Sequence, residues 1–75
     1  MAATMANMEY VFADTLSPDQ LMEEDAIKFE DEIVIVKDVV ELKEGYLICA
    51  TNDFGEELEF IVSDNTKLEW YVIQD

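Results

Sequence analysis

The sequence predicts a small, mainly β domain of five strands with a short helical turn near its N-terminal end. Several short runs alternate apolar and polar residues with the two-residue period of a half-buried strand. The longest apolar run is rich in β-branched residues, and Gly, Asn and Asp mark the breaks between runs. Because 75 residues suffice for only one core, we expect residues 9–75 to form a single domain and residues 1–8 a flexible leader.

The first segment of the domain is a short β-prone run at residues 10–12, followed by signals that start a helix. Ser17 is a favourable N-cap, Pro18 suits the first helical position, and Gln20 is the third residue of a capping box. We therefore expect one helical turn, or slightly more, over residues 18–24.

The strands are expected where the alternation is strongest. The first covers residues 26–30, and Glu30-Asp31 supplies the turn after it. The second is the long run 32–42, in which Lys37-Asp38 shifts the apolar phase and predicts a bulge. The remaining elements follow in chain order: a third strand over 46–51, a hairpin turn over 52–55 with Gly55 at positive φ, a fourth strand over 57–62, a single 3₁₀ turn over 63–67 and a fifth strand over 68–73.

This order of elements resembles that of the SH3-like small β-barrels over residues 26–73. The resemblance implies a five-stranded barrel. It does not imply binding of proline-rich peptides, because residues 10–14 do not match the Ala-Leu-Tyr-Asp-Tyr-type stretch of SH3 domains. Residues 21–27 are also similar to the L-x-x-G-D-x-I pattern that leads into the first strand of several small β folds, with Glu24 in the place of the glycine.

The charge of the chain is strongly acidic. It carries 19 Asp and Glu residues against four Lys, with no Arg and no His, and its formal net charge is −15. This charge excludes nucleic acid as a direct ligand, because phosphate binding needs a surplus of Lys and Arg, and it disfavours an anionic membrane surface. The partner that fits is a basic protein surface, such as the nucleic-acid-binding groove of a host protein. Solubility alone is the other explanation of the charge.

Catalysis and cofactor binding are not expected. Without histidine, a Ser or Cys nucleophile lacks its usual base, and no Cys/His or calcium-loop spacing predicts a metal site. Asp53-Phe54-Gly55 copies a protein-kinase metal motif but is expected to be a hairpin turn. The single Cys49 is expected to be a buried, inert thiol. No secretory signal or membrane span is recognised, so we expect a cytoplasmic protein.

The acidic residues are concentrated in two segments, because residues 19–32 and residues 51–75 each carry a net charge of −6. Carboxylates two residues apart on a strand, such as Glu57 and Glu59, recur about every 6.6 Å, a spacing similar in scale to successive phosphates of a nucleic acid. We therefore expect an inhibitor that mimics nucleic acid, by functional analogy with small acidic proteins of phages. The residues expected to bind the partner are Glu23, Glu24, Asp25, Glu30, Asp31, Glu56, Glu57 and Glu59.

Other functions remain open at this stage. The protein is alternatively an adaptor that binds through exposed Phe54, Ile61 or Tyr71, or an assembly component whose long strand pairs edge to edge. An aromatic cage for methylated lysine would use Tyr46 with Phe54 and Tyr71, although core packing is the simpler role for these rings. The sequence does not specify an oligomeric state. Mimicry is favoured if the two acidic segments meet on one face, whereas solubility is the simpler explanation if they lie on opposite sides.

Overall fold

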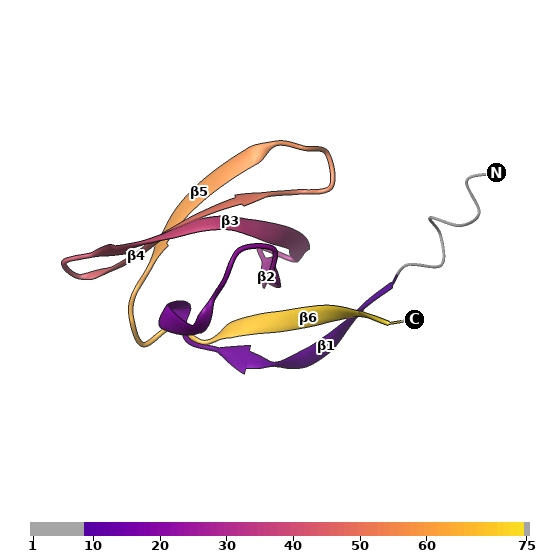
Figure 1. Ribbon diagram of the computed structural model, residues 1–75, viewed down its shortest axis with the longest axis horizontal. Helices are drawn as coiled ribbons and strands as arrows, with labels where there is room; N and C mark the ends of the chain where they lie inside the picture. Colours follow the sequence, from indigo (N-terminus) through magenta and orange to yellow (C-terminus); the bar gives the residue numbers. More distant parts are fainter. Residues whose placement is uncertain (1–8, 75) are drawn as a thin grey trace.

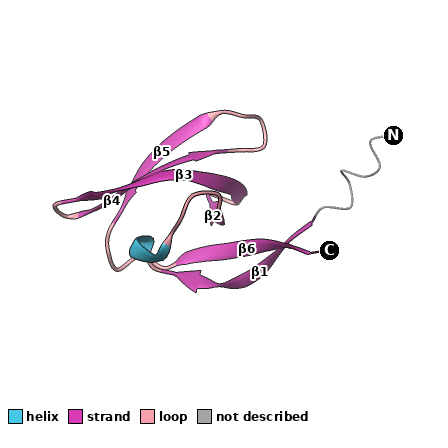
Figure 2. Ribbon diagram, viewed as in Figure 1, coloured by secondary structure: helices cyan, strands magenta, loops and turns pink. Residues whose placement is uncertain are grey.

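The computed structural model describes residues 9–74, which contain six β-strands and one short 3₁₀ helix (Figures 1 and 2). The predicted leader at residues 1–8 lies outside the described residues. The elements in chain order are β1 (Glu9–Leu16), η1 (Pro18–Gln20), β2 (Ala26–Phe29), β3 (Glu32–Leu42), β4 (Gly45–Thr51), β5 (Glu57–Val62) and β6 (Leu68–Gln74).

All six strands belong to one antiparallel sheet in the order β1-β6-β2-β3-β4-β5. The mainly β class is therefore confirmed. The expected five-stranded barrel is corrected to a six-stranded open sheet, because β1 and β5 are its two edges and do not pair with each other.

The additional strand is β1, of which the sequence indicated only residues 10–12. It pairs with β6 from Glu9↔Gln74 to Leu16↔Leu68, with an irregularity between Phe12 and Asp14. Most of its residues are exposed on both faces, so the strand has none of the alternation by which strands are recognised in a sequence. Its formation depends on the free edge of β6.

The sheet curls so that its two ends enclose the core. β2 and β5 are separated by two strands in the sheet, yet the rings of Phe29 and Phe60 stack with centroids 3.8 Å apart and planes inclined by 9°. In Figure 1, β1 and β6 lie below this space and β3, β4 and β5 lie above it. The buried core residues are Leu21, Ile27, Val34, Val36, Ile48, Ala50 and Leu68.

The helical turn starts where the sequence predicts but is shorter. Gln20 Oε1 accepts a hydrogen bond from the Ser17 backbone N–H at 3.0 Å, which supplies the reach-back bond of a capping box. The helix ends at Gln20, and the expected extension to residue 24 is wrong. Leu21 adopts an extended conformation (φ −73°, ψ 145°) and its side chain enters the core instead.

The turns between the strands largely match the prediction. Gly55 has a φ of 78°, and its N–H donates to the Asn52 carbonyl oxygen at 3.0 Å. The register of β3 against β4 shifts between Val36 and Asp38, which confirms the bulge. The expected 3₁₀ turn before β6 is a hydrogen-bonded turn instead, in which the Thr66 N–H donates to the carbonyl oxygen of residue 63 at 3.1 Å.

Within residues 9–74, no helix has the length and apolar character needed to cross a membrane.

Candidate protein-interaction surface

The bulge in β3 determines which side chains face outward at the centre of the sheet. Val36 before the bulge is buried and Val39 after it packs on the same core. The extra residue turns Asp38 to the outer face, where its cross-strand neighbour is Cys49 on β4. Cys49 in turn pairs with Glu59 on β5. Two carboxylates therefore flank one thiol across three strands.

A groove of about 290 Å³ follows this row on the outer face of β3, β4 and β5. We call it the acidic groove and define it by Lys37, Asp38, Cys49, Glu57 and Glu59, which line it. Successive side chains of a strand point to opposite faces, so Glu57 and Glu59 both face outward while the side chain between them packs on the core.

Glu24 brings a further carboxylate to the margin of the acidic groove. Its Oε2 lies 3.1 Å from Lys37 Nζ. The loop that carries it is fixed to β3, because the Glu24 N–H donates to the Val36 carbonyl oxygen and the Val36 N–H donates to the Asp25 carbonyl oxygen, each at 2.8 Å. Glu24 has a φ of 76°, a left-handed conformation that favours glycine.

A second group of carboxylates lies at one end of the sheet. The β2–β3 turn carries Glu30 and Asp31, and the β4–β5 hairpin carries Glu56. Both connections lie at the same end of the sheet, on the right in Figure 1. Because β3 and β4 are antiparallel and Ile35 pairs with Thr51, the residues that precede Ile35 and the residues that follow Thr51 extend toward the same end. Glu56 directly precedes Glu57, so this end is continuous with the acidic groove.

The structure separates the predicted partner-binding residues. Glu57 and Glu59 line the acidic groove, and Glu30, Asp31 and Glu56 share the adjoining end of the sheet. Glu24 reaches the groove only through its ion pair with Lys37 and lines a different pocket with the half-buried Asp25, whereas Glu23 is exposed and lines neither pocket. Sequence reasoning missed Asp38, although the shift of apolar phase at Lys37-Asp38 was the signal that a side chain there changes face.

Cys49 is half-buried beneath the carboxylates of the groove, not fully buried as the sequence suggested. Its thiol donates to Glu59 Oε2 across 4.0 Å. Partial burial raises the pKa of the Cys49 thiol, and the negative charges of Glu59, Asp38 and Glu57 raise this pKa further. At neutral pH this shift favours the protonated thiol, which is a weaker nucleophile than the thiolate.

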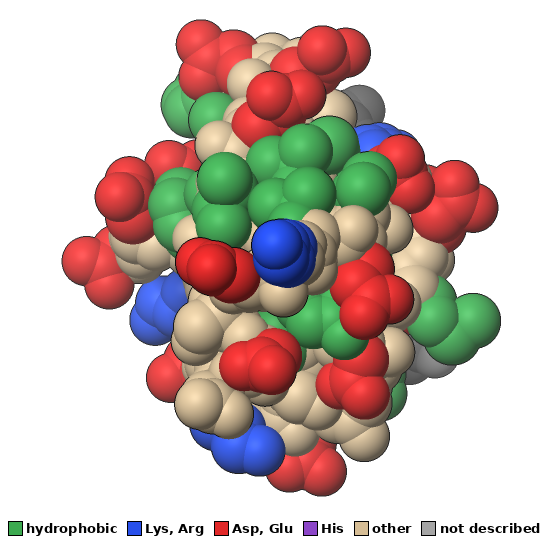
Figure 3. Space-filling view, turned by 90° about the vertical axis from the view of Figure 1, so that its left-hand side faces the viewer, with side chains coloured by type: hydrophobic (Ala, Val, Ile, Leu, Met, Phe, Trp, Pro, Cys, Tyr) green, Lys and Arg blue, Asp and Glu red, His purple; other side chains and the backbone are tan. Residues whose placement is uncertain are grey.

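An apolar row adjoins the acidic groove on the same outer face. It consists of Val40, Leu47 and Ile61, which are direct cross-strand neighbours two residues along from Asp38, Cys49 and Glu59. Ile61 is 68% exposed and Val40 is 41% exposed. Figure 3, which looks onto the β3–β4 hairpin end, shows hydrophobic side chains gathered there with Asp and Glu side chains around them.

The three aromatic residues considered for a cage do not meet. Tyr46 is the second residue of β4, and Phe54 lies beyond the other end of that strand with 85% of its surface exposed. The ring of Tyr71 packs edge-on against Phe12 of β1, with centroids 5.9 Å apart. An aromatic cage built from Tyr46, Phe54 and Tyr71 is therefore excluded.

Within residues 9–74, Asp, Glu and Cys side chains form no group of three or more that could hold a metal ion. Comparison of the chain with protein-family models, with curated proteins and with solved structures found no match.

Proposed function

We propose that this protein is a non-enzymatic binding module that inhibits another protein by occupying its basic nucleic-acid-binding surface. The observation that carries the proposal is the convergence of carboxylates from three separate segments on one face. The loop before β2 supplies Glu24, the bulge of β3 supplies Asp38, and β5 supplies Glu57 and Glu59. A distribution that served solubility alone would not need to place these groups together.

The charge on this face is nearly uncompensated. Lys37 and Glu24 form the only ion pair among the described residues, and their side chains are 47% and 71% exposed. An exposed pair of this kind contributes little to stability and leaves the other carboxylates of the groove without a cation. A Lys- or Arg-rich partner surface would meet a matching potential, which speeds association and makes it sensitive to salt.

The backbone supports the same interpretation. In the described residues, a positive φ outside glycine occurs at Glu24, Glu30 and Asp31, and all three are predicted partner-binding residues. Glycine would avoid the steric cost of this conformation, which is about 1–2 kcal/mol for other residues. All three residues lie in turns, where one or two left-handed residues are ordinary, and these turns expose their carboxylates to solvent. The exposed carboxylates are thus available to a basic partner.

The relation to SH3-like barrels is proposed for β2 to β6 only. These five strands are neighbours in the sheet and follow the order of elements expected from the sequence. β1, the strand that this resemblance did not include, is then an addition at the edge of β6. The outer face of β5 is accessible, because Glu57, Glu59 and Ile61 are all exposed.

The proposal is tested by capture and competition. The purified protein is immobilised, captured host proteins are identified by mass, and duplex DNA is added to the complex. We expect DNA to displace the captured protein, and binding to weaken at least about tenfold between low and high salt. A captured protein that neither binds DNA nor is displaced by it contradicts the proposal.

The apolar row supports a second candidate, an adaptor that binds its partner through Val40, Leu47 and Ile61. In that case Ile61→Ser abolishes capture, whereas neutralising Glu57 and Glu59 changes it little. The mimic predicts the reverse order of effects. Both variants alter exposed positions of β5. Each variant therefore controls for an effect of the other on the folding of this strand.

A further inference from the structure

The open edge of β5 exposes backbone hydrogen-bonding groups. β5 is the last strand on one side of the sheet, and no strand of residues 9–74 lies beyond it (Figure 1). In the hairpin before it, the Asn52 N–H donates to the Glu56 carbonyl oxygen at 3.1 Å. Hydrogen-bonded and non-hydrogen-bonded pairs alternate along an antiparallel ladder. Starting from the bonded pair of Asn52 and Glu56, this alternation directs the backbone N–H and C=O groups of Glu57, Glu59 and Ile61 to the open edge.

The two faces of this edge differ in chemistry. On the outer face, the carboxylates of Glu57 and Glu59 are exposed and line the acidic groove. On the inner face, Leu58 and Phe60 pack on the core but stay half-buried, because no further strand covers them. A strand added at this edge would therefore meet carboxylates with every second side chain and apolar surface with the side chains between them.

We propose that an extended segment of the basic partner adds to β5 as a further antiparallel strand, in which Lys or Arg alternates with apolar residues. Its basic side chains lie opposite Glu57 and Glu59, and its apolar side chains extend the core beside Leu58 and Phe60. All strand pairs of this sheet are antiparallel, so the added strand continues the existing pattern. In strand addition, backbone hydrogen bonds supply affinity and alternate side chains supply specificity.

A second copy of this chain does not fit the β5 edge. Pairing of β5 with β5 would bring the carboxylates of Glu57 and Glu59 against those of the other copy, and like charges across a strand pair are destabilising. A basic segment reverses the sign of this interaction. The β1 edge fits such a segment less well, because its register is irregular between Phe12 and Asp14 and a bulge interrupts the ladder.

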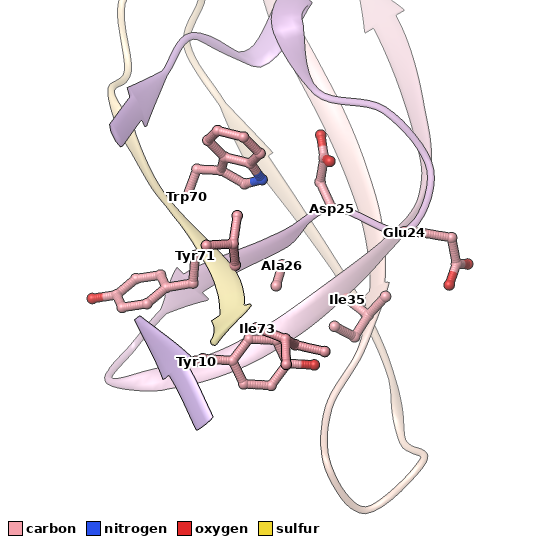
Figure 4. A pocket seen from close by; sticks show the side chains of 9 residues that line it. Tyr10, Glu24, Asp25, Ala26, Ile35, Trp70, Tyr71 and Ile73 are labelled. Carbon is pink, nitrogen blue, oxygen red and sulfur yellow. The ribbon is translucent and has the colours of Figure 1, made fainter. Parts of the chain in front are cut away.

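The cavity of about 250 Å³ beside β6 offers no single surface for a partner. Figure 4 shows that its lining is divided by the sheet, with Trp70 and Asp25 on one side and Tyr10, Ile35 and Ile73 on the other. One side chain of a partner could not contact both groups. The β5 edge, in contrast, presents its backbone groups and its carboxylates along one strand.

The identity of the partner rests on the proposed function, but the edge is tested with peptides alone. The full chain, labelled with ¹⁵N, is titrated with the acetylated and amidated peptide Lys-Val-Lys-Val-Lys-Val and followed by NMR. The matched control is Lys-Lys-Lys-Val-Val-Val, which has the same composition and charge without the alternation. We expect the alternating peptide to bind at least about tenfold more tightly than the control.

Methylation of the peptide backbone separates strand addition from attraction between charges. Residues directly opposite Glu57 and Glu59 exchange both backbone hydrogen bonds with them, so the lysine N–H groups of the peptide donate to β5 and the valine N–H groups point away. N-methylation at the lysines should therefore weaken binding at least about tenfold, and N-methylation at the valines should change it far less.

Variants of β5 locate the added strand. Glu59→Gln removes the charge and keeps the edge N–H, whereas Glu59→Pro removes both at an edge position where proline is tolerated. We expect both variants to weaken binding, and the proline variant to weaken it more. Glu44→Gln removes one carboxylate from the exposed β3–β4 turn and should leave the affinity unchanged. In the complex, hydrogen exchange should slow at the N–H groups of Glu57 and Ile61.

The inference is overturned if no peptide binds, since the carboxylates then only protect the edge. It is also overturned if the control peptide binds as tightly as the alternating one, or if methylation at lysine and at valine has equal effects. Its failure is distinct from failure of the proposed function. A captured partner that DNA displaces, without any preference among the peptides, contradicts only strand addition. Preference for the alternating peptide, with a partner that DNA does not displace, contradicts only the mimic.

Discussion

At the scale of single residues, Glu24 connects the local backbone with the charged surface. Its side chain reaches Lys37 at the margin of the acidic groove, and its N–H is bonded to Val36 of β3. Its φ of 76° also explains the similarity of residues 21–27 to a pattern with glycine at this position. The position needs a left-handed backbone, which glycine supplies most easily.

The cost of this conformation gives a test. Glu24→Gly and Glu24→Ala both remove the carboxylate, but only glycine relieves the strain. We expect the glycine variant to be more stable than the alanine variant by about 1 kcal/mol, because strain relief exceeds the entropy that glycine adds to the unfolded chain. Urea denaturation measures the difference in free energy of unfolding. An alanine variant as stable as the glycine variant would contradict the assigned φ.

Cys49 gives a second test at this scale. Because partial burial and the carboxylates of Glu59, Asp38 and Glu57 raise its pKa, alkylation at pH 8 should be slower than that of a free thiol. We expect Glu59→Gln and high salt each to accelerate the reaction in the folded protein. A rate equal to that of a free cysteine in all three conditions would show that the thiol does not lie beneath these charges.

The same pKa shift affects stability at alkaline pH. The folded state keeps the Cys49 proton at pH values where the unfolded chain, with its thiol pKa near the ordinary value of 9.0, has lost it. The unfolded state then binds fewer protons, so the free energy of unfolding falls as pH rises above about 9. We expect Cys49→Ser to reduce this fall, while Tyr46 and Tyr71, whose pKa values are also raised, preserve part of it. Denaturant titrations at pH 8 and pH 10 measure both effects.

At the scale of elements, strands with one buried face were predicted to within about a residue or two, and strands defined by distant partners were not. In β5, Leu58 and Phe60 pack on the core and alternate with the exposed Glu57, Glu59 and Ile61, so the alternation reveals the strand and its outward-facing carboxylates. β1 has no such pattern, and the sequence indicated only a fragment of it.

The residues of the candidate site likewise divide into those that a local pattern predicts and those that only long-range strand pairing brings together. Glu57 and Glu59 could be predicted because their strand is recognisable locally. The position of Asp38 opposite Cys49 depends on the geometry of a bulge, and the pocket that contains Asp25 and Trp70 depends on the pairing of β2 with β6. Neither relation between distant residues is visible in a local pattern.

The curl of the sheet is tested by the stacked rings of Phe29 and Phe60, which lie on strands that are not neighbours in the sheet. A double-mutant cycle with leucine at each position should give a coupling energy of about 0.5–1.5 kcal/mol, the range for aromatic pairs in contact. Phe12 and Phe54, each exposed on other elements, provide a control pair with no expected coupling. Additive effects at Phe29 and Phe60 would mean that the sheet is flatter than described.

At the scale of the whole molecule, a net charge of −15 on 75 residues sets the balance between stability and binding. Like charges destabilise the compact state, and one exposed ion pair in the described residues offsets little of this repulsion. Within residues 9–74 the core is continuous and includes no buried charged residue, so the repulsion acts between exposed groups.

Stability should therefore rise with NaCl from about 0.01 to 1 M, as the screening length falls from about 30 Å to about 3 Å. A variant with Glu9→Gln, Glu44→Gln and Asp64→Asn, three exposed residues outside the acidic groove, should show a smaller rise. Thermal denaturation at each salt concentration measures the trend. A melting temperature that is independent of salt would show that self-repulsion is not a significant term.

The central claim is that the acidic groove, and not the total charge, binds the partner. The most direct measurement is the salt dependence of the dissociation constant for the captured partner with three proteins: the original chain, the groove variant Asp38→Asn, Glu57→Gln and Glu59→Gln, and the charge-matched variant at Glu9, Glu44 and Asp64. We predict that the groove variant binds at least about tenfold more weakly with a shallower salt dependence, and that the charge-matched variant behaves like the original chain. Equal weakening of the two variants, or binding unaffected by salt, would contradict the claim.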